Sequence, residues 1–238
     1  MDRFFEGLGA FDPGSIGFWL ALAALLASLY GLRELVTGGD LRLTGGTSEH
    51  DRNMGLVVGA IGGALSGLLW YAFNPISIVP PFIHLRLFAF LIPVIGLLFG
   101  RGAGFIAGYV ATLVWAPLAG AFVPLHSPIA DGIMVGLTGW IPAVLLRGKR
   151  TNSELLAYIA EDPWRWYRRC AVVCLFTGLF MAFVVAVSLS LTTPLTFWVS
   201  FWAIGVVSDT LPMMLFTGLV SHWLLRMTRP SWSWMPQY

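Results

Sequence analysis

Five ionisable side chains lie within or beside long apolar runs of the sequence. His84 and Arg86 follow a proline-rich segment, whereas His126 and Asp131 flank the start of a later apolar run and Asp209 lies inside the last one. Ionisable residues in membrane segments usually pair with one another or line a binding site. We therefore predict that Arg86, Asp131 and Asp209 converge at one depth as a polar, ligand-binding pocket, with both histidines beside them. The alternatives are an Arg–Asp pair that only holds helices together, or contact of Arg86 with a lipid phosphate.

Two further residues extend the predicted pocket. Asn74 begins residues 74–81, whose three prolines exclude a helix and predict a short, stiff outer loop above the pocket. Trp70 ends the preceding apolar run, where aromatic side chains usually form an interfacial belt, although they can also stack on a planar ligand. Both interpretations of Trp70 stay open, and we include Trp70 and Asn74 among the candidate ligand-binding residues. The spacing of the histidines and acids matches no metal-binding motif, so we expect neither a metal nor a cofactor.

The composition places these residues in a membrane protein. The 238-residue chain is 57% hydrophobic and 11% charged, and its mean hydropathy is +0.78. Its net charge of +2, without a basic face, excludes nucleic acid as a partner and leaves the lipid bilayer as the surroundings. The apolar runs predict an all-α, polytopic transmembrane bundle of about seven helices. These helices cover residues 15–32, 54–73, 85–100, 103–122, 129–146, 168–191 and 196–226.

Basic residues set the predicted orientation of the bundle. Those between Arg147 and Arg169 cluster beside two helix ends and are expected on the cytoplasmic side. Threading the helices from this anchor gives an N-out, C-in topology, in which every Lys and Arg except Arg3 and Arg86 lies inside. We divide the chain into residues 1–53, an N-terminal transmembrane helix with a cytoplasmic loop, and residues 54–238, a six-helix core with a short cytoplasmic tail.

Glycines line one face of the helix predicted at residues 54–73. Gly55, Gly59, Gly63 and Gly67 follow one another at four-residue spacing. Small residues at this spacing let a second helix approach closely. We predict a docking face for a partner subunit, and packing against another helix of this chain is an equal alternative.

Residues 80–147 combine an outer proline loop, a helix entered by an arginine, a glycine-rich return helix and a Ser-Pro opening of the next helix. This pattern resembles the substrate-binding S-components of energy-coupling factor vitamin transporters, and the resemblance covers residues 54–226. The segments that carry it are Leu85-Arg86-Leu87, residues 92–100, the glycines Gly100, Gly104 and Gly108, and residues 127–131.

The resemblance implies a six-helix membrane subunit with an outward-facing pocket for a vitamin-sized molecule, to which this chain adds an N-terminal helix. The glycine series from Gly55 to Gly67 would dock a transmembrane coupling subunit, and separate ATPase subunits would supply the energy. The chain itself would catalyse nothing. We expect it in the cell membrane of a prokaryote.

Two other functions fit the same residues. A structural or assembly subunit of a larger membrane complex would use the glycine faces for protein neighbours and bind no small molecule. A membrane enzyme would use Asp131 and Asp209 as an acid–base pair. No nucleotide-binding loop, dinucleotide fingerprint or hydrolase elbow is present, so we do not expect an enzyme.

Overall fold

The structure is a computed structural model that describes residues 49–73, 77–79, 83–123, 126–148 and 150–227. The predicted first helix and Asn74 lie outside these residues. The described part is mostly helical, with one two-stranded antiparallel sheet and three π-helical segments, η3, η4 and η5. The elements are α3 (Glu49–Ala72), β1 (Ser77–Val79), β2 (Ile83–His84), η2 (Leu87–Phe90), α4 (Leu91–Phe99), α5 (Arg101–Leu118), η3 (His126–Asp131), α6 (Gly132–Pro142), η4 (Ala143–Arg147), α7 (Asn152–Glu161), α8 (Pro163–Thr192), α9 (Phe197–Ser200), η5 (Phe201–Thr210) and α10 (Leu211–Met227).

Each predicted helix from residue 54 onward corresponds to a helical segment of the structure. Within the residues that the structure describes, four helical stretches are long and apolar enough to cross a membrane, and a shorter apolar helix covers Leu87–Phe99. Large apolar side chains on these stretches are exposed, among them Ile61, Phe176 and Leu215. Such a surface suits contact with lipid chains. The four stretches are Gly55–Ala72, His126–Arg147, Pro163–Thr192 and Phe197–Met227.

Helix α7 was not predicted, because residues 147–169 were interpreted as a cytoplasmic loop. Its first turn is a capping box, in which the backbone N–H of Glu154 donates to the Thr151 hydroxyl over 3.2 Å and the backbone N–H of Thr151 donates to the Glu154 carboxylate over 2.8 Å. The helix is too short to span a membrane. It instead buries one apolar face against α8 and α10, through Leu155, Leu156 and Ile159.

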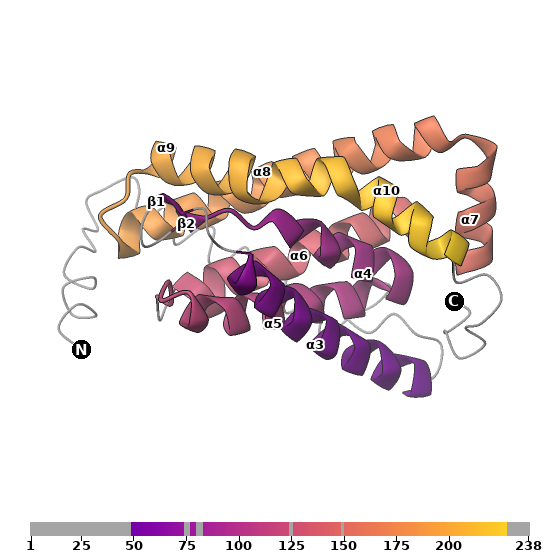
Figure 1. Cartoon of the computed structure of the whole chain (residues 1–238), viewed down its shortest axis with the longest axis horizontal. Helices are drawn as coiled ribbons and strands as arrows, with labels where there is room; N and C mark the ends of the chain where they lie inside the picture. The colour runs from indigo at the N-terminus through magenta and orange to yellow at the C-terminus, as the bar shows by residue number, and fades with distance from the viewer. Residues whose placement is uncertain (1–48, 74–76, 80–82, 124–125, 149, 228–238) are drawn as a thin grey trace.

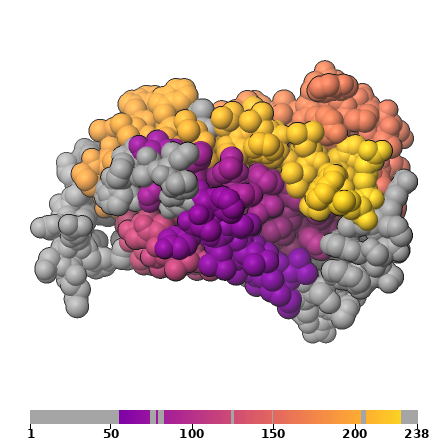
Figure 2. All heavy atoms as spheres, viewed as in Figure 1, coloured from indigo at the N-terminus to yellow at the C-terminus, as the bar shows by residue number. Residues whose placement is uncertain are grey.

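The longer helices run roughly along the long axis of the molecule, with β1, β2 and α9 at one end and α7 at the other (Figure 1). Helix α3 packs along α5, α5 packs along α6, and α4 contacts both α5 and α6. Helix α8 joins this group to η5 and α10. In the space-filling view, α3 covers part of one face of the molecule (Figure 2).

Helices α3 and α5 touch through their backbones. A Cβ atom added to Gly63 would lie only 2.5 Å from the carbonyl oxygen of Ala107 in α5. Real Cβ atoms do not approach an oxygen so closely, so a side chain here would push the helices apart. The same arrangement repeats along the two helices, where Gly59 faces Ala103, Gly63 faces Ala107 and Gly67 faces Ala111.

The predicted docking face on α3 is therefore already filled by this chain. Gly59, Gly63 and Gly67 are in contact with α5, and Gly55 is the only member of the series with room for a Cβ atom, whose nearest neighbour would be 3.8 Å away. A separate subunit cannot reach this face while α5 occupies it. The intrachain alternative describes Gly59, Gly63 and Gly67, so docking of a partner through these three is wrong, and docking at Gly55 stays a prediction.

Gly100 makes the turn that brings α5 back along α4. Its φ of 96° lies in the region that favours glycine, and α4 ends just before it while α5 begins just after it. The turn places Gly104 against the backbone of Gly139 in α6, and Gly108 against Val135. The close contact of α4, α5 and α6 positions the ends of α5 and η3, where the candidate site lies.

Candidate functional site

The three charged residues predicted to converge do meet, and we call them the Arg86 cluster. Nη2 of Arg86 lies 2.9 Å from Oδ2 of Asp131, and Nη1 lies 3.4 Å from Oδ1 of the same carboxylate. Nη1 also lies 3.6 Å from Oδ1 of Asp209. All three side chains are buried. One guanidinium thus joins two carboxylates that come from separate helical segments.

Both carboxylates lie in π-helical segments. Asp131 is the last residue of η3, and Asp209 is the last but one of η5. Such widened turns re-aim side chains and are frequent at functional sites. Pro212 gives a local reason for η5, because it has no N–H to donate to the carbonyl of Ser208 and so interrupts the regular helical ladder.

Two indole rings hold the Arg86 guanidinium. Its Cζ lies 4.1 Å from the ring centroid of Trp115 and 5.2 Å from that of Trp70. At these distances each ring attracts the cation, typically by about 0.5 to 2 kcal/mol. Trp70 is only 1% exposed, so the interfacial-belt interpretation is wrong for this residue. Tyr71 and Phe73, beyond it, are exposed as a belt requires.

Ser208 attaches the β2 strand to η5 beside the cluster. Its hydroxyl donates to the carbonyl of His84 over 2.7 Å and accepts the backbone N–H of Arg86 over 3.3 Å. Partial burial lowers the pKa of His84, and the nearby Arg86 guanidinium lowers it further. Nδ1 of His126 lies 3.0 Å from the hydroxyl oxygen of Ser188 in α8.

A small cavity lies among these side chains. It is bordered by the predicted ionisable residues, by Trp115 and Ser208, and by apolar residues of β2 and α8. Its volume is about 20 Å³, enough for one water molecule. Pockets for small organic ligands measure about 300 to 1,000 Å³. In this arrangement the cavity is too small for a vitamin-sized molecule, which fits only if the surrounding groups separate.

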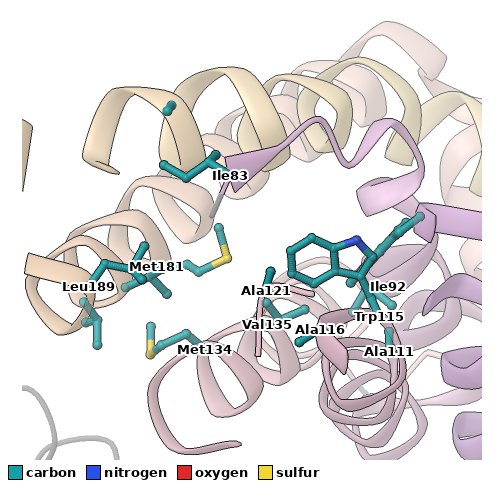
Figure 3. Close-up of a cluster of buried hydrophobic side chains, with 14 of the residues drawn as sticks. Ile83, Ile92, Ala111, Trp115, Ala116, Ala121, Met134, Val135, Met181 and Leu189 are labelled. Atoms are coloured by element: carbon teal, nitrogen blue, oxygen red, sulfur yellow. The ribbon is translucent and has the colours of Figure 1, made fainter. Parts of the chain in front are cut away.

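A buried apolar cluster from four different elements adjoins the site. Ile83 of β2 and Trp115 of α5 border the cavity, and Met134 of α6 and Met181 of α8 belong to the same cluster (Figure 3). Apolar surroundings of this kind strengthen the electrostatic interactions of the charged groups. The site therefore combines a desolvated surface with a few charged atoms, as ligand sites do.

Several buried polar atoms of the site make no hydrogen bond within the described part of the chain. They are Oδ2 of Asp209, Nδ1 of His84, and the indole nitrogens of Trp70 and Trp115. A buried polar atom without a partner costs about 1 to 3 kcal/mol. Each such atom in a native structure asks for an explanation, and a bound ligand or water supplies one.

Sequence reasoning did not include Trp115 or Ser208 in the site. Trp115 lies near the end of α5, at the same end of the bundle as Asp131, and the alternation of helix directions could have placed it there. Ser208 directly precedes Asp209, but nothing in the sequence shows that it holds β2.

Comparison of the chain with protein-family models, curated proteins and solved structures found no match. The function therefore has to be argued from the geometry of the site. Among the described residues, no group of three or more His, Cys, Asp or Glu side chains could hold a metal ion.

Proposed function

We propose that the chain is the substrate-binding membrane subunit of a micronutrient uptake transporter, similar to the S-components of energy-coupling factor transporters. The observation that carries the proposal is the Arg86 cluster beside a cavity at one end of the helical bundle. A structural ion pair needs one carboxylate for one guanidinium. Here two carboxylates border the cavity together with Trp115, and one carboxylate oxygen and the Trp115 indole N–H have no hydrogen-bond partner in the described part of the chain, which suits a site that also binds a ligand.

The proposed topology has seven membrane helices, with the N-terminus outside and the C-terminus in the cytoplasm of a prokaryotic cell. The Arg86 cluster then lies at the outer end, and Arg147 with the basic residues around α7 lies at the inner end. The placement of β2 and α7 at opposite ends of the bundle supports this assignment (Figure 1).

Ligand entry in this proposal requires the site to open. The contacts that must yield are the longer one between Nη1 of Arg86 and Asp209, and the hydrogen bonds of Ser208 with His84 and with the backbone of Arg86. Each is a side-chain contact, so the helices can stay packed while the pocket enlarges. A coupling subunit would bind a surface other than the glycine series, because α5 fills that face.

Catalysis by the two aspartates is not part of the proposal. An aspartyl acid–base pair needs one protonated and one ionised carboxyl group. Arg86 interacts with both carboxylates, so neither could act as an acid or a base without breaking a buried ion pair.

Native mass spectrometry of the gently purified full chain tests the proposal. We expect a retained small organic molecule, and co-purified coupling and ATPase subunits in part of the sample. Retention should be lost in Asp209→Asn and kept in Glu161→Gln, a matched change of charge on exposed α7. A stable complex with other membrane subunits and no small molecule would instead support the structural alternative.

A further inference from the structure

We propose that the ligand of this site is a cation, an organic molecule whose protonated amine or amidine group binds the unused oxygen of Asp209. This inference rests on the proposed function and specifies its substrate class. It follows from the charge balance of the cavity, from the geometry of the two carboxylates and from the aromatic surroundings.

The charge balance favours a positive ligand. Arg86 brings one positive charge to the cavity, whereas Asp131 and Asp209 bring one negative charge each in their ionised forms. No second Lys or Arg is among the described residues that line it. A ligand carboxylate would add a third negative charge beside a single guanidinium in a desolvated site. A cationic group would instead bring the sum to zero.

Arg86 contacts both oxygens of one carboxylate but only one oxygen of the other, and the remaining oxygen is the atom that we expect to bind the ligand. Both oxygens of Asp131 face Arg86, at 2.9 and 3.4 Å. Asp209 has Arg86 near Oδ1 only, and its Oδ2 has no hydrogen-bond partner in the described part of the chain. The Asp209 side chain is buried and borders the cavity. Oδ2 is therefore an acceptor that a ligand N–H can reach without displacing Arg86 from Asp131.

The aromatic surroundings already accommodate one planar cation. The guanidinium of Arg86 lies over the rings of Trp115 and Trp70 and interacts with two carboxylates. Indole faces and carboxylates are the groups with which proteins bind organic cations. An anionic ligand would have to draw Arg86 away from Asp131 and leave that carboxylate buried without its partner.

Three probes of matched size separate the charge classes, namely benzamidine (cation), benzamide (neutral) and benzoate (anion). Their binding to the purified full chain in lipid nanodiscs can be measured by ligand-observed NMR and by thermal shift. We expect benzamidine to bind most tightly and benzoate not to bind. Asp209→Asn should weaken benzamidine binding about 30-fold or more, as expected when a buried charge partner is removed, and Glu161→Gln should leave it unchanged.

The outcomes distinguish this inference from the function on which it rests. Tighter binding of benzamide or benzoate, or the absence of benzamidine binding, overturns the cationic class in the wild-type chain, whether or not Asp209→Asn folds. If native mass spectrometry still recovers a neutral or anionic organic ligand, the transport proposal stands while the cationic class fails. If it recovers no small molecule and none of the probes binds, both fail.

Discussion

Two arginines are buried in the described part of the chain, and their partners differ. Arg86 lies at the β2 end of the bundle and interacts with side chains, namely two carboxylates and two indole rings. Arg147 lies at the α7 end and donates to backbone carbonyls. Its Nη1 reaches those of Leu97 and Leu98 over 2.8 and 2.7 Å, and its Nε reaches that of Arg150 over 3.0 Å.

The type of partner separates a binding site from a structural contact. The carbonyls of Leu97 and Leu98 belong to the last turn of α4, where helices have no intrahelical donors of their own, so Arg147 completes the end of a helix. Those carbonyls cannot turn towards another group unless α4 moves. The carboxylates beside Arg86 can rotate and change partners. Burial of a charge alone does not identify a functional site, whereas exchangeable partners support one.

Substitution of Arg86 by methionine should have the largest effect on stability. Arg86→Met leaves Asp131 and Asp209 buried without a cation, and removing one partner of a buried ion pair costs about 3 to 5 kcal/mol. The free energy of unfolding, measured by titration with denaturing detergent, should fall by that amount. Ligand retention in native mass spectrometry should be lost as well.

A triple variant shows whether Arg86→Met loses stability because two carboxylates are left without a cation. Arg86→Met combined with Asp131→Asn and Asp209→Asn removes the unpaired charges, so most of the stability should return while ligand retention does not. Recovery of retention in this variant would show that the Arg86 cluster holds helices together and binds nothing.

Substitution of Arg147 should have a smaller effect, and one on stability alone. Arg147→Met leaves the carbonyls at the end of α4 without their donor, which costs about 2 to 3 kcal/mol when such groups stay buried. The same detergent titration measures the loss. Retained ligand, normalised to folded protein, should match that of the wild type, and Arg147→Lys should recover part of the stability. Loss of ligand from folded Arg147→Met protein would contradict the assignment of Arg86 to a binding site and of Arg147 to a structural contact.

The convergence of Arg86, Asp131 and Asp209 could be predicted from the sequence because position along a membrane helix determines depth in the membrane. Each residue adds a fixed rise, so the depth of a charged residue follows from its distance to the helix end. Depth was sufficient to bring together residues that are 45 and more positions apart. The capping box at Thr151 and Glu154 would likewise have identified α7, had residues 147–169 been searched for a short interfacial helix.

The rotation of each helix about its axis could not be predicted. Trp70 faces the interior while Tyr71, the next residue, is exposed, and no periodic pattern in the apolar sequence distinguishes them. Rotation also decides which neighbour fills a glycine face, so α5 could not be distinguished from a separate subunit as the partner of Gly63. The small volume of the cavity depends on side-chain pairing, which the sequence does not specify.

Substitution of Gly63 tests whether the packing of α3 against α5 affects ligand binding at the Arg86 end of the molecule. In Gly63→Ala the new Cβ would lie 2.5 Å from the Ala107 carbonyl oxygen, so α3 must shift away from α5. We expect a loss of about 1 to 2 kcal/mol in unfolding free energy. Because α3 carries Trp70 beside Arg86, ligand retention should also fall.

Gly55→Ala is the matched control for that substitution. It makes the same chemical change on the same helix and in the same series, but the nearest atom to the new Cβ would be 3.8 Å away, an ordinary contact distance. Alanine also has a higher helix propensity than glycine, by about 1 kcal/mol, so the unfolding free energy should stay unchanged or rise. An equal loss in both variants would mean that the glycines act through helix propensity or flexibility. A loss confined to Gly63→Ala would show that contact with α5 sets the position of Trp70, and so connects helix packing to the Arg86 end of the molecule.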